Sequence, residues 1–297
     1  MKFAIALLSV SLMSAHAQNI PAPESQPVVA LLTAVGDRIE VVRQRQTVGS
    51  NLEPFTRQVV HVPSQTLNYA ALRGLAKAMA EEEPQDRLVL LRWTIPAELA
   101  ERMEAARGIE RQQLVLDAVL GHLRQLPQRS EWDRIELLVP AYAFAEVAGM
   151  GPKLSGIGVY IQPLSKQSAD FGGMGGNDAI TLSDVDGDFR TINPNTGELG
   201  NSSVFVAPFM YFDRLTYDAR TLVLVKRQRY FSNTKYADPM SSALDVADQM
   251  PQGQLIAKMV ETIEHSAYKS VRQTKGEVTV SAPKPVSAVD GAASAPR

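Results

Sequence analysis

The chain has 297 residues, of which 45% are hydrophobic and 21% are charged, and its formal net charge is −2. This composition is typical of a soluble globular protein, and the charge gives no electrostatic reason to expect nucleic acid or an anionic membrane as a partner. There is no cysteine, which excludes disulfides, thiolate metal sites and a cysteine nucleophile.

The N-terminus has the pattern of a secretory signal peptide. Lys2 precedes an apolar run over residues 3–13, and Ala15-His16-Ala17 matches the small-x-small cleavage pattern. We therefore predict a signal peptide over residues 1–17 and a mature chain that begins at Gln18. The apolar run is too short for a membrane span, so none is expected after cleavage. The predicted location is the bacterial periplasm, with secretion as the alternative.

Residues 18–27 are rich in proline and polar residues and are predicted to be a flexible leader. Residues 28–35 and 38–45 flank Gly36-Asp37, a typical turn sequence. We predict that these two segments pair as a β-hairpin.

Strands and helices are expected to alternate over the next eighty residues, which predicts parallel strands joined by right-handed crossovers. The predicted elements are a strand over residues 58–62, a helix over 64–82 with Ser64 as its N-cap, a strand over 87–93, a helical region over 96–126 broken near Gly108, and a strand over 135–139.

The middle of the chain has little periodicity. We expect a short helix over residues 143–148 and a strand over 156–162, followed by a long irregular loop over 163–202. A loop of this length in a compact domain is either functional or mobile. Within it we expect a small hairpin that turns at residues 195–197.

Residues 203–231 are predicted to form a central antiparallel hairpin with its turn at residues 217–220. Residues 204–212 are apolar on both alternating sides, which is typical of a strand that is covered on both faces. Beyond Val225 the sequence becomes basic at Lys226, Arg227 and Arg229. We interpret this run as a solvated strand end.

A short helix is predicted over residues 241–250, and an amphipathic helix over 254–272 is expected to pack on the sheet and close the fold. Residues 276–297 are predicted to be a disordered tail. The chain should therefore form one mixed α/β domain over residues 28–275. Its sheet should be partly parallel and extended by the antiparallel central hairpin.

Motifs for metal binding are weak. The histidines that remain after cleavage, His61, His122 and His265, do not pair at the spacing of metal ligands. Asp184, Asp186 and Asp188 begin like a calcium loop, but the glycine and the closing glutamate of such a loop are missing. We expect a solvated acidic turn and no metal site.

Motifs for catalysis or cofactor binding are also absent. The glycines of residues 171–178 precede a predicted strand rather than a helix, which argues against a phosphate-binding loop. No nucleophile elbow, P-loop or dinucleotide-binding fingerprint occurs. We assign no catalytic residue and no cofactor.

One candidate site follows from architecture alone, because ligands of open parallel sheets bind beyond the carboxyl ends of the strands. The residues expected at this rim are His61, Pro63, Ser64, Trp93, Thr94, Pro140 and Tyr142.

The sequence favours a non-catalytic binding or accessory factor of the bacterial envelope, whose partner is an envelope protein or a small molecule. Two alternatives stay open. An exported hydrolase would require His61, Ser64 and a carboxylate to converge. A small-ligand binding protein would require an apolar cleft with few polar groups at the rim around Trp93.

Overall fold

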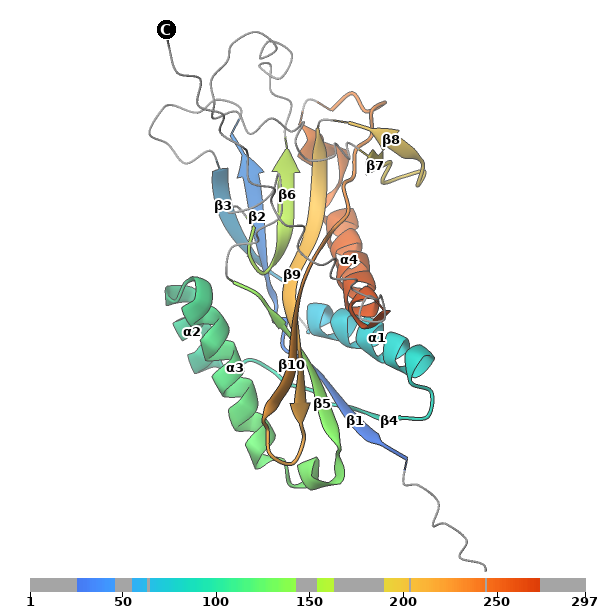
Figure 1. The fold of residues 1–297 in the computed structure, drawn as a ribbon. Coiled ribbons are helices and arrows are strands. Elements are labelled where there is room, and N and C mark those ends of the chain that lie inside the picture. Colours follow the sequence, from blue (N-terminus) through green and yellow to red (C-terminus); the bar gives the residue numbers. More distant parts are fainter. Residues whose placement is uncertain are drawn as a thin grey trace, which may run out of the picture.

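The computed structural model describes residues 26–45, 55–62, 65–142, 154–162, 190–202, 204–243 and 245–272. These residues form a mixed α/β fold, as the sequence predicts (Figure 1). The helices are α1 (Thr66–Glu82), α2 (Ala97–Ala105), α3 (Gly108–Gln125) and α4 (Gln252–Arg272). The strands are β1 (Val28–Thr33), β2 (Arg38–Gln44), β3 (Phe55–His61), β4 (Arg87–Leu90), β5 (Arg134–Pro140), β6 (Ile157–Gln162), β7 (Arg190–Ile192), β8 (Leu199–Asn201), β9 (Phe205–Asp218) and β10 (Leu224–Asn233).

The sheet is organised around β9, the longest strand, as expected for the central hairpin. β10 pairs antiparallel with residues 209–217 of β9. On the opposite edge of β9, β6 pairs with the first half of the strand and β5 with the second half. β5 and β6 therefore lie end to end along one edge of β9, and the sheet divides there into two branches (Figure 1).

The predicted hairpin of residues 28–45 is wrong. β1 pairs in parallel with β4 and β5, whereas β2 pairs in parallel with β6 and antiparallel with β3. Gly36, with a φ of 79°, allows the chain to bend between the two strands instead of reversing. β1 and β2 thus belong to different branches of the sheet.

The predicted crossovers are correct in one case of two. β4 and β5 are both parallel to β1 and lie on either side of it, joined through α2 and α3. The unit from β3 through α1 to β4 is not a parallel crossover, because β3 is antiparallel to β2 and lies at the other end of the sheet order. β3 therefore returns the chain to the middle of the molecule, where α1 begins.

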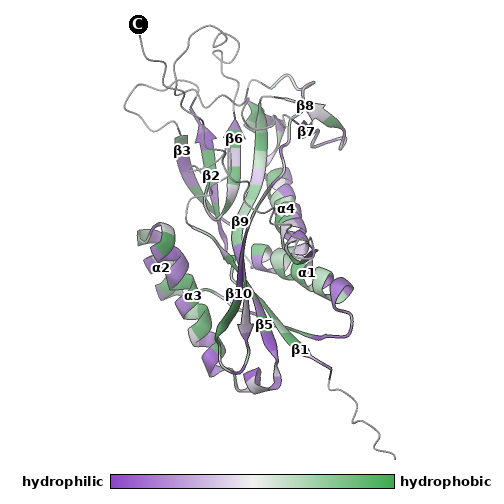
Figure 2. Ribbon diagram, viewed as in Figure 1, coloured by the Kyte–Doolittle hydropathy of each residue, from purple (hydrophilic) through white to green (hydrophobic). Residues whose placement is uncertain are grey.

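Helices cover both faces of the sheet (Figures 1 and 2). Val206, Met210 and Phe212 of β9 face a core shared with α1 and α4, and Leu215 and Tyr217 face a core shared with α2 and α3. None of the first twelve residues of β9 is exposed. The expectation that residues 204–212 are covered on both faces is therefore confirmed for the strand. The amphipathic C-terminal helix also packs as predicted, with Met259, Ile263, Ala267 and Val271 buried.

Some predictions about shorter elements are correct and others are wrong. The hairpin of β7 and β8 turns near Gly197, as expected. Residues 241–243 are not helical, and the short helix predicted over 241–250 is reduced to a 3-10 turn at Val246–Gln249 that is capped by Asp245. β9 continues to Asp218, and the chain turns between that residue and Leu224.

Several predicted segments lie outside the described residues. They are the signal peptide and most of the leader (residues 1–25), Pro63 and Ser64, the helix over 143–148, residues 163–189 with the glycine-rich and acidic motifs, and the tail beyond residue 272.

Candidate functional site

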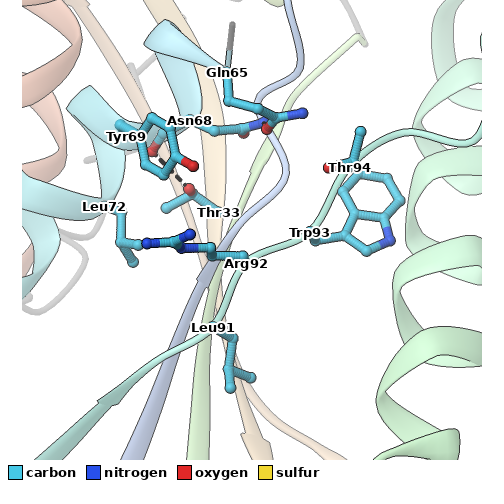
Figure 3. Close-up of a pocket in the computed structure, with 9 residues that line it drawn as sticks. All are labelled: Thr33, Gln65, Asn68, Tyr69, Leu72, Leu91, Arg92, Trp93 and Thr94. Carbon is cyan, nitrogen blue, oxygen red and sulfur yellow. Dashed lines mark hydrogen bonds between the residues drawn. The ribbon is translucent and has the colours of Figure 1, made fainter.

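A pocket of about 260 Å³ lies where β1 and β4 end and α1 begins (Figure 3). It occupies part of the predicted rim, because β1 and β4 are parallel and their carboxyl ends meet at the same level of the sheet. Its lining residues are Thr33, Gln65, Asn68, Tyr69, Leu72, Leu91, Arg92, Trp93 and Thr94.

Asn68 of α1 fixes the backbone at the floor of this pocket. Its Oδ1 accepts hydrogen bonds from the N–H groups of Val35 (2.8 Å) and Gly36 (3.2 Å). The main-chain carbonyl oxygen of Asn68 accepts a hydrogen bond of 2.8 Å from the Thr33 hydroxyl, shown dashed in Figure 3. Asn68 is 5% exposed, so these bonds satisfy buried groups at the bend between β1 and β2. Its side-chain oxygen therefore serves the fold and is not free for a ligand.

Gln65 occupies the N-cap position of α1 in place of the predicted Ser64, and its side chain makes no capping hydrogen bond. Its φ of 58° places it in the left-handed region, which is uncommon for a residue other than glycine. The Gln65 Oε1 accepts a hydrogen bond of 2.6 Å from the Asn68 Nδ2. A local hydrogen bond to Asn68 thus accompanies the left-handed conformation of Gln65 at the edge of the pocket.

The charge in the pocket comes from Arg92. Its guanidinium carbon lies 5.9 Å from the centre of the Tyr69 ring, an arrangement in which the ring face attracts the cation. Among the described residues it forms no ion pair with a carboxylate. Leu72 supplies apolar surface beside it, whereas the Leu91 side chain packs against the core shared with α2 and α3. The pocket therefore combines an aromatic ring, the aliphatic side chain of Leu72 and one cation that has no acidic partner within the described part of the chain.

Trp93 contributes less to the pocket than the sequence suggests. Neighbouring residues on an extended strand point to opposite sides, and Figure 3 shows Arg92 on the side of α1 and Trp93 directed the other way. Trp93 is 6% exposed and packs in the core shared with α2 and α3. It is mainly a core residue, and Thr94 is the exposed polar group next to it.

His61 lies outside the pocket. Its Nδ1 is 3.6 Å from Asp37, and both side chains are more than half exposed. Nearby, Arg38 donates a hydrogen bond of 2.5 Å to Glu104 of α2, and this bond is the main cause that lowers the pKa of Glu104. His61 therefore belongs to a solvated charge cluster beside α2.

Pro140 and Tyr142 complete the predicted rim on the same side as α3. Pro140 is the last residue of β5 and pairs with Phe212. The Arg111 guanidinium lies 5.2 Å from the Tyr142 ring centre, and burial of the Tyr142 hydroxyl raises its pKa to about 12. A phenol with this pKa stays neutral at physiological pH and does not act as a base there.

The described residues of the predicted rim thus lie at one level of the sheet, but they do not form one site. The structure brings Trp93 and Thr94 together at the pocket, and it places His61 and Tyr142 elsewhere. The described residues therefore give no support to the hydrolase alternative, and Ser64 lies outside them.

Sequence reasoning missed Arg92, Tyr69 and Asn68. One signal was present for Asn68, which falls among the apolar residues of the helix stripe. Arg92 gave no signal, because an arginine at a strand end is ordinary. Only the position of Tyr69 opposite it makes the pair recognisable.

The described residues contain no group of three or more histidine, aspartate or glutamate side chains arranged to hold a metal ion. None of the helices among them is both long and apolar enough to cross a membrane.

Comparisons with known proteins give little further information. No protein family matches the sequence, and no curated protein is significantly similar to it. A structure of a Helicobacter pylori protein described as a neuraminyllactose-binding hemagglutinin homolog is 6% identical, covers 86% of each chain and has a TM-score of 0.34. A Xanthomonas campestris protein of the DUF330 family is 9% identical over 84% of this chain and 80% of its own, with a TM-score of 0.29.

A hypothetical protein of Chlamydia trachomatis is 10% identical over 82% of this chain and 98% of its own, with a TM-score of 0.24. Scores this low do not establish a common fold. These likenesses therefore carry no inference about what this chain binds.

Proposed function

We propose that this chain is a non-catalytic binding protein that is exported to the bacterial periplasm and holds a small organic anion in the pocket of Arg92. The observation that carries the proposal is Arg92, a cation that lines a pocket of about 260 Å³ and has no acidic partner among the residues that the structure describes. This volume is slightly below the range of about 300–1,000 Å³ for pockets that take drug-sized ligands. The ligand class is therefore small, of the size of a single aromatic or aliphatic acid.

The surroundings of Arg92 favour a carboxylate with an apolar body. The guanidinium presents its N–H groups in a planar fork that matches a carboxylate. The Tyr69 ring and Leu72 offer surface for the rest of such a molecule. Asn68 and Thr33 are already bonded to the backbone, so the polar selectivity of the pocket rests on Arg92, Gln65 and Thr94.

Export is the second part of the proposal and rests on the sequence. Lys2, the apolar residues 3–13 and Ala15-His16-Ala17 support cleavage before Gln18. The absence of cysteine suits an exported chain that relies on its core rather than on disulfides.

A charge-matched pair of probes tests the ligand class. Saturation-transfer NMR with the mature protein should detect binding of benzoate, and the neutral benzamide of the same shape should bind more weakly. Arg92→Met should weaken benzoate binding by about tenfold or more, since a hydrogen bond to a charged group contributes about 1.5–3 kcal/mol. Arg124→Met, which removes an exposed arginine near the end of α3, is the matched control. Equal binding of benzoate and benzamide, or equal loss in the two variants, would refute the proposal.

A further inference from the structure

A second cationic site lies on β10, independent of the pocket. Asp213 of β9 is completely buried, and its carboxylate is bound by two arginines of the neighbouring strand. The Arg227 Nη2 lies 2.6 Å and the Arg229 Nη2 lies 3.2 Å from the same Oδ2 atom. The amide of Gln112, from α3, donates a further hydrogen bond of 2.6 Å to this oxygen. The two guanidiniums are therefore fixed side by side.

The charges at this site do not balance. One carboxylate compensates one guanidinium, and neither arginine forms an ion pair with another carboxylate among the described residues. The Arg227 and Arg229 side chains are 46% and 38% exposed. Neither Nη1 group is used in the bonds to Asp213. A fixed pair of exposed guanidiniums thus carries one excess positive charge, and the Arg229 guanidinium also lies 5.5 Å from the centre of the Tyr211 ring.

The pair lies on an open edge of the sheet. Among the described strands β10 pairs only with β9, so alternate N–H and C=O groups of β10 point away from the sheet. Residues 224–229 are exposed except for the half-exposed Gln228. The register is regular from Lys226 to Asn233 and is interrupted only at Val225. A segment of strand with regular register is therefore available next to the arginine pair.

We propose that the outer edge of β10 binds an extended acidic segment of a partner protein by strand addition. Arg227 and Arg229 are two residues apart, which corresponds to about 7 Å along a strand. This spacing matches carboxylates at alternate positions of an added strand, so backbone hydrogen bonds supply affinity and the arginines select for acidic residues. A second copy of β10 is disfavoured as the occupant, because its own arginines would repel this pair.

Two labelled peptides test this proposal with the full mature chain. The acidic peptide Thr-Glu-Val-Glu-Val-Glu-Thr should bind in a fluorescence anisotropy titration, whereas its glutamine analogue should not. Replacing both arginines, as Arg227→Gln with Arg229→Gln, should weaken binding by about tenfold or more. Lys226→Gln is the matched control, because it removes a charge from the same strand but does not bind Asp213. It should change the affinity much less.

A measurement on the unmodified protein tests the proposal even if the double variant does not fold. Amide hydrogen exchange should slow within β10 when the acidic peptide is added, because strand addition covers its open N–H groups. Unchanged exchange in β10, or equal weakening by Lys226→Gln, would overturn the proposal. Binding of phosphatidylglycerol vesicles without binding of the peptide would also overturn it and assign the surface to a membrane.

Discussion

At the scale of single residues, Asp213 is the most informative position. The run at Lys226, Arg227 and Arg229 is exposed, as expected for a solvated strand end. That run alone does not indicate that both arginines also bind the buried carboxylate of Asp213. An aspartate in the middle of an apolar strand was the available signal, because a buried carboxylate requires cationic partners.

Asp213→Asn should destabilise the protein in a pH-dependent way. Burial by itself raises the pKa of Asp213, but hydrogen bonds from Arg229 and Arg227 outweigh it, so the pKa lies below the ordinary aspartate value. A group with a lowered folded-state pKa contributes stability above its unfolded pKa of about 3.9 and loses it as the pH falls through the folded pKa. We expect urea unfolding at pH 7 to show a loss of about 1.5–3 kcal/mol in the variant.

The difference between the wild type and Asp213→Asn should then narrow steadily below about pH 4, as the contribution is lost. A difference that is constant from pH 7 to pH 3 would contradict an ionised Asp213.

Asn68→Ala should be costly for a different reason. It leaves the N–H groups of Val35 and Gly36 without their buried acceptor, and such unsatisfied groups cost about 1–3 kcal/mol each. We expect thermal or urea unfolding to show a loss of at least about 2 kcal/mol. Gln113→Ala, at an exposed position of α3, should change stability by less than about 0.5 kcal/mol. A similar small effect of both changes would mean that the bend does not depend on Asn68.

At the scale of elements, α1 and α4 approach each other unusually closely at Gly74. A Cβ atom at this position would lie 2.0 Å from the carbonyl oxygen of Glu264. Two helices can come this close only where one of them lacks a side chain. The contact therefore couples the first helix of the chain to the last.

Gly74→Ala should separate these helices and cost about 1–3 kcal/mol, the usual range for overpacking. Gly121→Ala, in the interior of α3, is the control because no atom lies within 4 Å of its added Cβ. There the substitution should stabilise the protein by about 0.5–1 kcal/mol, since alanine favours a helix. If urea unfolding shows a lower free energy of unfolding for Gly74→Ala and a higher one for Gly121→Ala, the close packing at Gly74 is supported. A stabilising effect of Gly74→Ala would contradict it.

The elements also show what the sequence could and could not predict. Periodicity predicted α1, the broken α2–α3 region, α4 and the buried β9, because these signals are local. The pairing of residues 28–45 was mispredicted because Gly36-Asp37 suits both a reversal and a bend. The bend is stabilised by hydrogen bonds to the side chain of Asn68, about thirty residues further along the chain. The pocket depends likewise on Arg92 meeting Tyr69 across two elements, and no local pattern records that contact.

At the scale of the whole molecule, the proposed periplasmic location requires that the chain is exported and that its signal peptide is cleaved. N-terminal sequencing of the protein recovered from the periplasm of an expressing bacterium should give a chain that begins at Gln18. Ala17→Arg should block cleavage, because the site requires small residues. Recovery of a chain that still carries Met1, or retention in the cytoplasm, would contradict the proposed location.

The central claim is that a small anion binds between α1, β1 and β4, and mapping the binding site by NMR tests it most directly. Adding millimolar benzoate to the ¹⁵N-labelled mature protein should shift the amide signals of Thr33, Tyr69, Leu72, Arg92 and Thr94, which line the pocket. In Arg92→Met, the signals of Thr33, Tyr69, Leu72 and Thr94 should stay in place when benzoate is added. Shifts that cluster at another part of the fold, or shifts that persist in Arg92→Met, would contradict the assignment of this pocket as the binding site.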